Sequence, residues 1–393
     1  MDSEVTVVGA GVVGSSLACL LSSHGIQVTL IDRGNPFSDL NEINQSFRTV
    51  ALNLSSVDLF KKIGLWDDLK SSSTPFARMF VWDSEGSSSL EFLAQEIKRQ
   101  ELGYIITNNL ILKNIQGFIK RSENITFKHN TELSGVELNE NTICVSCNNG
   151  EKFFSQLLVG ADGVNSTLRN LSGIKTRTWS YNQKAFVAGL KTEKPHEQSA
   201  WQIFTPTGPI ALLPFDNYKD INISLVWSAE DSYAKKLSKL TKKDFIKELE
   251  IKTERILGKI SLNTEINDFP LVQLHSKSYF SERMVLVGDA AHSVHPLAGQ
   301  GMNLGLSDVD SLFTKIINAR RSGIDIGLSQ ILKDYESSRK IPNLTMTALM
   351  EAFKRGFETP NPWIGLARNL AFKATSDSKI LKRKFIKEAA GIT

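Results

Sequence analysis

Residues 4–33 hold the pattern that most constrains how this chain can fold. Val5–Val8 is a β-branched apolar run of the kind found in buried parallel strands. A glycine-rich turn follows at once, then a helical pattern over residues 15–24, and then a second β-branched run over residues 26–31. This order predicts a βαβ unit with a parallel strand pair.

The glycines of the turn indicate what the βαβ unit binds. Gly9 permits a tight turn, Gly11 lets the backbone approach a pyrophosphate, and Gly14 lets the helix pack closely on the strand. The pyrophosphate would then lie at the positive N-terminal end of the helix. Asp32, 18 residues after Gly14 and next to Arg33, can accept a hydrogen bond from a ribose hydroxyl. We therefore predict a dinucleotide site.

Two further glycine passages decide between NAD and FAD. Asp162 and Gly163 follow a second buried strand pattern, and Gly288 and Asp289 follow a third, shortly before the glycine-rich stretch 296–303. An Asp at the end of a strand can hold a ribityl or ribose hydroxyl. A glycine-rich stretch that opens a helix suits the negative edge of a reduced flavin. An NAD dehydrogenase would not need this third passage, so the sequence favours FAD.

The middle of the chain has a different pattern. Residues 179–230 alternate polar and apolar positions in long strands with turns between them, whereas the chain after residue 291 reads as helical. We therefore expect a mixed α/β fold: a Rossmann-like FAD-binding domain interleaved with a mainly antiparallel β substrate domain, and a helical C-terminus. The expected boundaries are 1–72, 101–178 and 272–333 for the FAD-binding domain, 73–100 and 179–271 for the substrate domain, and 334–393 for the C-terminal region.

Composition excludes several classes of protein. The 393 residues carry a net charge of only +4, which is too small to suggest a nucleic-acid partner. No apolar run reaches the roughly 18 residues needed to span a bilayer. Three cysteines suit a reducing compartment, and the strand pattern near Met1 leaves no room for a leader peptide. We expect a cytoplasmic, bacterial protein, with a possible peripheral contact to the inner membrane.

The order of the three motifs resembles the class A flavoprotein monooxygenases, the family of p-hydroxybenzoate hydroxylase. Within it, residues 200–214 and the run from Gly288 to Asp308 resemble the ubiquinone-biosynthesis hydroxylases. The resemblance extends from Val5 to about Asn369. It implies an FAD-dependent monooxygenase that uses O2 to hydroxylate the ring of a polyprenylated phenol in ubiquinone biosynthesis, through a flavin C4a-hydroperoxide.

The resemblance also implies roles for individual residues. Arg48 would lie near the flavin, Asp162 would support the FAD, and Asp289 would bind its ribityl chain. The complete set of expected cofactor-binding residues is Gly9, Gly11, Gly14, Asp32, Arg33, Arg48, Asp162, Gly163, Gly288, Asp289, Pro296, Gly299, Gly301, Met302 and Asn303. The chain departs from the family at Pro342, where Asp is more common, and at Asn108, where Glu is common. The first departure puts in doubt the helix packing there.

No side chain identifies itself as a catalytic acid, base or nucleophile. His295, Pro296 and Gln300 are the candidates for the flavin edge. His292 and His295 lack the further ligands that a metal needs, so we predict no metal. Three aromatic residues can either line the substrate pocket or belong to the core of the sheet, and the sequence leaves both possibilities open. These residues are Trp201, Phe204 and Phe186.

Other questions also stay open at this stage. The substrate could instead be a soluble aromatic compound, and the chain could be a catalytically idle subunit of a biosynthetic complex. Electrons could come from NAD(P)H or from a separate reductase, since the chain has one dinucleotide fingerprint. The basic stretch 361–393 could contact anionic lipid, but a solvated helix face or a subunit contact, in a homo-oligomer or a complex, is the preferred interpretation.

Overall fold

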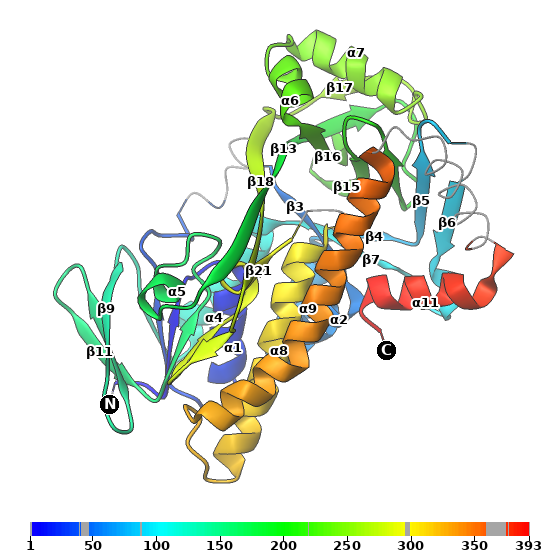
Figure 1. Ribbon diagram of the computed structural model, residues 1–393. Helices are drawn as coiled ribbons and strands as arrows, with labels where there is room; N and C mark the ends of the chain where they lie inside the picture. Colours follow the sequence, from blue (N-terminus) through cyan, green and yellow to red (C-terminus); the bar gives the residue numbers. More distant parts are fainter. Residues whose placement is uncertain are drawn as a thin grey trace.

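The computed structural model describes residues 2–38, 40, 47–86, 89–218, 220–294, 299–358, 375 and 377–392. Two large sheets and a helical layer dominate the molecule, as Figure 1 shows. The fold is a mixed α/β fold with a parallel sheet, a mainly antiparallel sheet and C-terminal helices, which confirms the expected fold class. The domain boundaries given above stay a prediction.

The first sheet has six strands in the order β19-β20-β12-β1-β2-β8, and all of its pairs are parallel except β19 with β20. Its central strands are fully buried, which explains why they read as continuous apolar runs. The strands are β1 (Val5–Val8), β2 (Val28–Ile31), β8 (Ile125–Lys128), β12 (Leu157–Gly160), β19 (Phe280–Ser281) and β20 (Met284–Leu286).

Helices and a small sheet pack on this parallel sheet and share its core. The antiparallel sheet β9 (Leu133–Leu138), β10 (Ile143–Cys147) and β11 (Lys152–Ser155) supplies part of that core. The helices are α1 (Val12–Ser22), α2 (Leu54–Ile63), α3 (Trp66–Ser71), α4 (Asn108–Arg121), α5 (Thr167–Leu171), α8 (Gln300–Arg321) and α9 (Ser329–Glu358).

The apolar spacing over residues 55–69 predicts helical structure, and the structure has two helices there, α2 and α3. Gly64 ends α2 in the left-handed conformation with φ of +84°, and its amide closes the last turn onto Lys61. A glycine adopts this conformation without the steric cost that other residues meet, so it ends the helix here.

The second sheet has nine strands and is antiparallel except where β5 runs parallel to β14. One face is covered by α6 (Asp231–Leu237) and α7 (Lys242–Lys252), and these form a second core. The strands are β5 (Arg78–Asp83), β6 (Ser89–Leu93), β13 (Thr176–Thr192), β14 (Ser199–Phe204), β15 (Ile210–Tyr218), β16 (Ile221–Glu230), β17 (Ile260–Leu262), β18 (Asn267–Ser276) and β21 (His292–Ser293).

The remaining elements join the two large sheets and close the chain. The three-stranded sheet β3 (Thr49–Asn53), β7 (Gly103–Thr107) and β4 (Thr74–Phe76) lies between them, and a small core joins it to β15 and β16. The 3₁₀ turns are η1 (Ala94–Ile97) and η2 (Gly288–Ala290), and the last helix is α11 (Lys379–Ala390). Within the part of the chain that the structure describes, no helix combines the length and the apolar character needed to cross a bilayer.

Candidate flavin site

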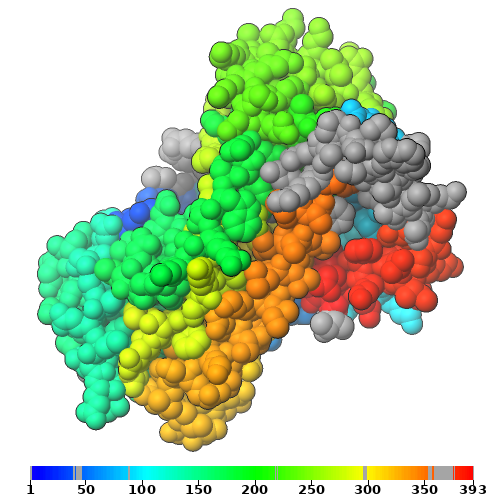
Figure 2. All heavy atoms as spheres, viewed as in Figure 1, coloured from blue at the N-terminus to red at the C-terminus, as the bar shows by residue number. Residues whose placement is uncertain are grey.

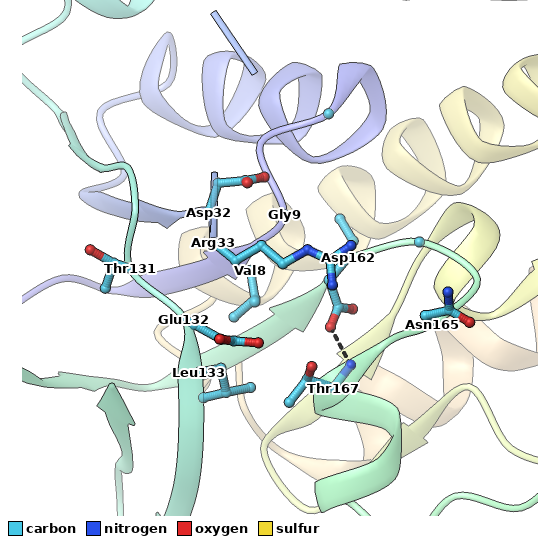
Figure 3. Close-up of a pocket in the computed structure, with 13 residues that line it drawn as sticks. Val8, Gly9, Asp32, Arg33, Thr131, Glu132, Leu133, Asp162, Asn165 and Thr167 are labelled. Carbon is cyan, nitrogen blue, oxygen red and sulfur yellow. Dashed lines mark hydrogen bonds between the residues drawn. The ribbon is translucent and has the colours of Figure 1, made fainter. Parts of the chain in front are cut away.

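A cavity of about 290 Å³ lies where the strand order of the parallel sheet reverses. The chain leaves β1 toward β2 on one side, while β12 pairs with β1 on the other. Loops that follow the ends of such strands diverge, and ligands of α/β sheets bind in the crevice that results. Figure 3 shows the side chains around this cavity, which is lined by Gly9, Gly11, Asp32, Arg33, Asp162 and Gly163, among others.

The three glycines of the first turn have different neighbours. A Cβ on Gly9 would lie 2.4 Å from the Ala161 carbonyl oxygen, and one on Gly14 would lie 2.0 Å from the Gly9 carbonyl oxygen. Both positions therefore need glycine for close backbone packing. A Cβ on Gly11 would meet no atom within 4 Å, and α1 has no acidic residue in its first turn. The space over Gly11 is thus open toward a positive helix end, as a pyrophosphate requires.

Asp32 holds the glycine turn in place. Its Oδ2 accepts a hydrogen bond from the Ala10 amide at 2.7 Å, and its Oδ1 accepts one from the Gly34 amide at 2.8 Å. Each oxygen keeps a second lone pair, so the predicted contact to a ribose hydroxyl remains chemically feasible. In Figure 3 the exposed side chain of Arg33 extends over the same cavity.

Asp162 has one oxygen in use and one without a partner. Its Oδ2 accepts from the amides of Thr167, at 2.7 Å, and Leu168, at 3.2 Å, at the start of α5 (Figure 3). Its Oδ1 is buried and has no hydrogen-bond partner in the structure. A buried acceptor of this kind costs free energy unless a donor reaches it. A hydroxyl of a bound dinucleotide would supply that donor, so the residues present fit FAD.

Arg169 connects two of the three glycine passages. The side chain is only 5% exposed, and it donates to the Val164 carbonyl at 2.6 Å and to the Ala290 carbonyl at 2.9 Å. Burial lowers the pKa of Arg169, and the nearby Asp162 carboxylate opposes this effect. The sequence alone does not indicate this role, because a buried Arg in a short helix gives no sign of which distant carbonyl groups it reaches.

We expect Arg169→Met to lower the affinity for FAD at least about tenfold, a loss of roughly 1.4 kcal/mol. Both turns lose a charged donor, and two carbonyl groups lose a partner, which should also destabilise the protein by about 2 kcal/mol. Titration of apoprotein with FAD and thermal melting measure the two effects. Arg321→Met, at an exposed position, serves as the control. Equal FAD affinity in the two variants would contradict the positioning role.

The third glycine passage, which begins at Gly288, forms the 3₁₀ turn η2. Gly288 has φ of +59°, and Asp289 beside it exposes its side chain. Asp289 nonetheless lies deep enough for burial to raise its pKa, while the charges of His292 and Arg48 act in the opposite direction. The Arg48 guanidinium also lies over the ring of Phe269, 4.8 Å from its centroid. The Arg48 charge thus acts on the Asp289 carboxyl, and the flavin contacts expected of these two residues stay a prediction.

The fully buried carboxylate of Asp308 stabilises the turn at Gly288 through hydrogen bonds. Asp308 Oδ2 accepts from the Gly288 amide at 3.0 Å and from His292 Nε2 at 2.5 Å. Its Oδ1 accepts from Arg339 Nε at 2.8 Å and from Asn343 Nδ2 at 3.1 Å. Burial alone would raise the pKa of Asp308, but the charges and hydrogen bonds of His292 and Arg339 lower it to about 2. Asp308 is therefore an anion that fixes the turn carrying Asp289.

The departure at Pro342 does not interrupt the helix packing that the sequence left in doubt. Helix α9 continues through Pro342, and the next residue, Asn343, is fully buried beside Asp308. Asn343 also accepts from the Arg339 guanidinium at 2.9 Å. Asn108, the second departure, is the first residue of α4, and its amide donates to the Arg48 carbonyl at 2.9 Å.

Most of the residues expected at the flavin edge lie at the start of α8. Gly299 precedes the helix with φ of +64°, and a Cβ there would lie 3.1 Å from that of Ala51. Asn303 uses its amide within the protein, because it accepts from the Asn53 amide and the Ser56 hydroxyl and donates to the carbonyls of Ala51 and Gly299. Its side chain thus braces α8 against β3 and α2.

The other expected flavin-edge residues differ in how the structure places them. Gln300 is buried at the first position of α8. Gly301 follows it in the first turn, and Met302 packs partly buried against the main core. His295 and Pro296 lie outside the described residues.

The structure does not bring the three candidate substrate aromatics together. Phe186 is buried on the sheet face under α7, 6.2 Å from the ring of Phe245, and Trp201 packs against that same core. Phe204 lies in another cluster, where it stacks on Phe357 of α9 with ring centroids 3.9 Å apart. Phe186 and Phe204 therefore belong to two different cores, and a single pocket formed by all three side chains is not present.

Comparisons with known proteins agree with this site. Residues 2–346 match the FAD binding domain family. The chain is 32% identical over 392 residues to a 3-demethoxyubiquinol 3-hydroxylase of Escherichia coli, with 99% of each chain covered. It is 33% identical over 389 residues to a ubiquinone hydroxylase of Rhodospirillum rubrum, covering 99% of this chain and 90% of that one.

Among the described residues, no three His, Cys, Asp or Glu side chains form a group that could hold a metal.

Solved structures show the same fold. A p-nitrophenol 4-monooxygenase from Pseudomonas putida superposes with a TM-score of 0.80 at 17% identity, covering 99% of this chain and 98% of that one. A probable FAD-dependent monooxygenase from Pseudomonas aeruginosa also reaches 0.80, at 20% identity, covering 96% and 100%. With the glycine turn, Asp162 and Asp289 in place, the chain belongs to the family of FAD-dependent monooxygenases that includes the ubiquinone-biosynthesis hydroxylases.

Proposed function

We propose that this monooxygenase hydroxylates the aromatic ring of a polyprenylated phenol in ubiquinone biosynthesis. The observation that carries the proposal is the similarity to two ubiquinone-pathway hydroxylases over 99% of the chain. The glycine turn and Asp162 line one cavity, and Arg169 joins the Asp162 loop to the Asp289 turn, which supports the proposal. NAD(P)H or a separate reductase would supply the electrons.

Bound FAD would supply the redox chemistry that activates O2 for transfer of one oxygen atom to the ring. The residues of the protein would bind the FAD and orient it. The N-terminus of α1 and the open space over Gly11 would hold the pyrophosphate, and the free Oδ1 of Asp162 would accept from a hydroxyl. At the other end, Asp289 would bind the ribityl chain, and the Arg48 charge opposes the effect of burial on the pKa of this carboxyl. The Asp308 network beneath Gly288 keeps this second end rigid.

The function is tested with purified holoprotein, O2 and an electron donor. We expect a short-chain polyprenyl phenol to gain one oxygen atom that derives from O2, as mass spectrometry with labelled O2 would show. NADH, NADPH and a flavin reductase are compared as donors. A p-nitrophenol control tests the competing soluble-aromatic reading. Turnover of p-nitrophenol together with inert polyprenyl phenols would overturn the proposed substrate class but not the FAD chemistry.

A further inference from the structure

Helix α11 leaves an unusual set of side chains exposed. Its inner face is anchored by Ile386 and Ala390, which are 3% and 2% exposed, and Ile386 packs into a small core with Ala94 of η1. Large apolar side chains nevertheless point to solvent elsewhere on the helix. Ile380 is 81% exposed, Leu381 45% and Phe385 42%. Burying such side chains is favourable, so exposing three of them on one short helix indicates a surface that contacts an apolar phase.

Cations surround these apolar side chains. Helix α11 holds five basic residues and one acidic residue, Glu388. Lys382 is used within the protein, because its Nζ lies 2.7 Å from Glu96 Oε1. The other four basic side chains are exposed: Lys379, Arg383, Lys384 and Lys387. Two more exposed cations, Lys98 and Arg99, directly follow η1, the element that α11 contacts.

The two kinds of side chain are interleaved on the exposed side of the helix. Residues four positions apart lie above one another on a helix, so Leu381 stands over Phe385 and Ile380 over Lys384. Lys387 continues the same side one turn further. We define Ile380, Leu381, Arg383, Lys384, Phe385 and Lys387 as the α11 patch. In Figure 2 part of α11, in red, lies open on the molecular surface.

We propose that the α11 patch binds the surface of an anionic lipid bilayer. A bilayer surface offers negative charge and an apolar layer within a few ångströms of each other, which matches cations interleaved with large apolar side chains. Surfaces that bind other proteins are depleted in lysine at their core, whereas lysines lie among the apolar residues here. The proposal rests on the proposed function for its purpose, because a polyprenylated substrate resides in the membrane.

The position of α11 would hold the enzyme in one orientation on that bilayer. Its C-terminal Gly391 packs against the start of α2, where a Cβ on Gly391 would lie 2.4 Å from Ser55 Oγ. The Asn53 amide, at the same place, is hydrogen-bonded to Asn303 of α8 at 3.0 Å. The patch is thus fixed to the rest of the molecule by contacts with α2 and η1.

Vesicle co-sedimentation of the FAD-loaded protein tests the proposal. Vesicles of phosphatidylcholine with phosphatidylglycerol should bind at least about tenfold more protein than vesicles of phosphatidylcholine alone, and added salt should reduce the difference. Arg383→Glu with Lys384→Glu, and separately Ile380→Ser with Phe385→Ser, should each abolish this binding. Lys243→Glu with Lys247→Glu makes the same change of charge on exposed residues of α7, which lies at the top of Figure 1, away from α11, and should bind normally.

Several outcomes would overturn the proposal. These are no binding to anionic vesicles, equal binding to neutral ones, or equal losses in the α7 control. Loss of a protein oligomer in the α11 variants, with unchanged vesicle binding, would assign the patch to a subunit contact instead. The assay contains no phenol and no electron donor, so it can succeed or fail independently of the proposed reaction. The FAD content and melting temperature of each variant confirm that it is folded.

Discussion

Gly11→Ala is expected to weaken FAD binding at least about tenfold, or roughly 1.4 kcal/mol, and to leave the apoprotein nearly as stable as the parent. The new methyl group meets no protein atom within 4 Å, so it would enter the open space in which we propose that the pyrophosphate binds. Gly11 has φ of −66° and ψ of −179°, a conformation that alanine adopts without strain. The change in unfolding free energy should therefore stay within about 1 kcal/mol.

Gly14→Ala should behave differently, although it lies only three residues away. Its Cβ would sit 2.0 Å from the Gly9 carbonyl oxygen, so either the backbone or the helix must shift, at a cost of about 3 kcal/mol. Gly117→Ala in α4, where the nearest atom is 3.6 Å away, is the control. Calorimetry of the apoproteins and titration with FAD separate the two effects. A destabilised Gly11→Ala apoprotein, or one that binds FAD normally, would contradict this account of the turn.

Asp308→Asn is expected to destabilise the protein by about 3 kcal/mol, because Arg339 loses the buried anion that neutralises it and His292 loses its hydrogen-bond partner. Asp308 is fully buried and Arg339 is only 14% exposed, so water cannot easily replace the carboxylate. Asp310→Asn, in the same helix, is the matched control. Asp310 pairs with Lys62 at 2.6 Å, but both side chains are at least 40% exposed, and the loss should be less than about 1 kcal/mol.

The effect of Asp308 should also depend on pH. The folded protein lowers the pKa of this carboxyl from 3.8 to about 2. A lowered pKa means that the stabilisation is complete above pH 4 and is lost as the pH falls toward 2. The difference corresponds to about 2 kcal/mol. Denaturant melts of parent and variant between pH 2 and pH 7 measure it. If the unfolding free energies of the parent and Asp308→Asn changed in parallel with pH, Asp308 would not be the buried anion described above. Equal losses of stability in Asp308→Asn and Asp310→Asn would lead to the same conclusion.

Local patterns predicted the binding turns well. Gly9, Gly11 and Gly14 are determined by the strand and helix on either side of them. The structure places Gly9 and Gly11 at the cavity, and Gly14 packs against Gly9. The Asp308 network could not be predicted in this way. Its members are His292, Asp308 and Arg339, which meet only after α8 and α9 have packed, and no local spacing indicates that contact.

The aromatic candidates show a second limit of the sequence. Alternation along a strand indicates which residues share a face, but it does not indicate what covers that face. Both faces of β14 are buried, one under α6 and α7 and the other against the end of α9. Trp201 and Phe204 are three positions apart, so alternation places them on opposite faces of the strand. Only the tertiary packing shows that each of these faces is covered by a core.

Residues that complete the FAD site lie both before and after the second core in the sequence, and this order determines when FAD can bind during synthesis. The buried residues of the second core all lie between residues 186 and 260, so that core can form before translation ends. The FAD site needs more of the chain, because the Ala290 carbonyl that Arg169 binds and the Asp308 that holds Gly288 come later. A nascent chain that stops before residue 290 carries the first glycine turn without the parts that complete its site. During synthesis the second core can therefore form first, and the complete FAD site forms only after Asp308 has left the ribosome.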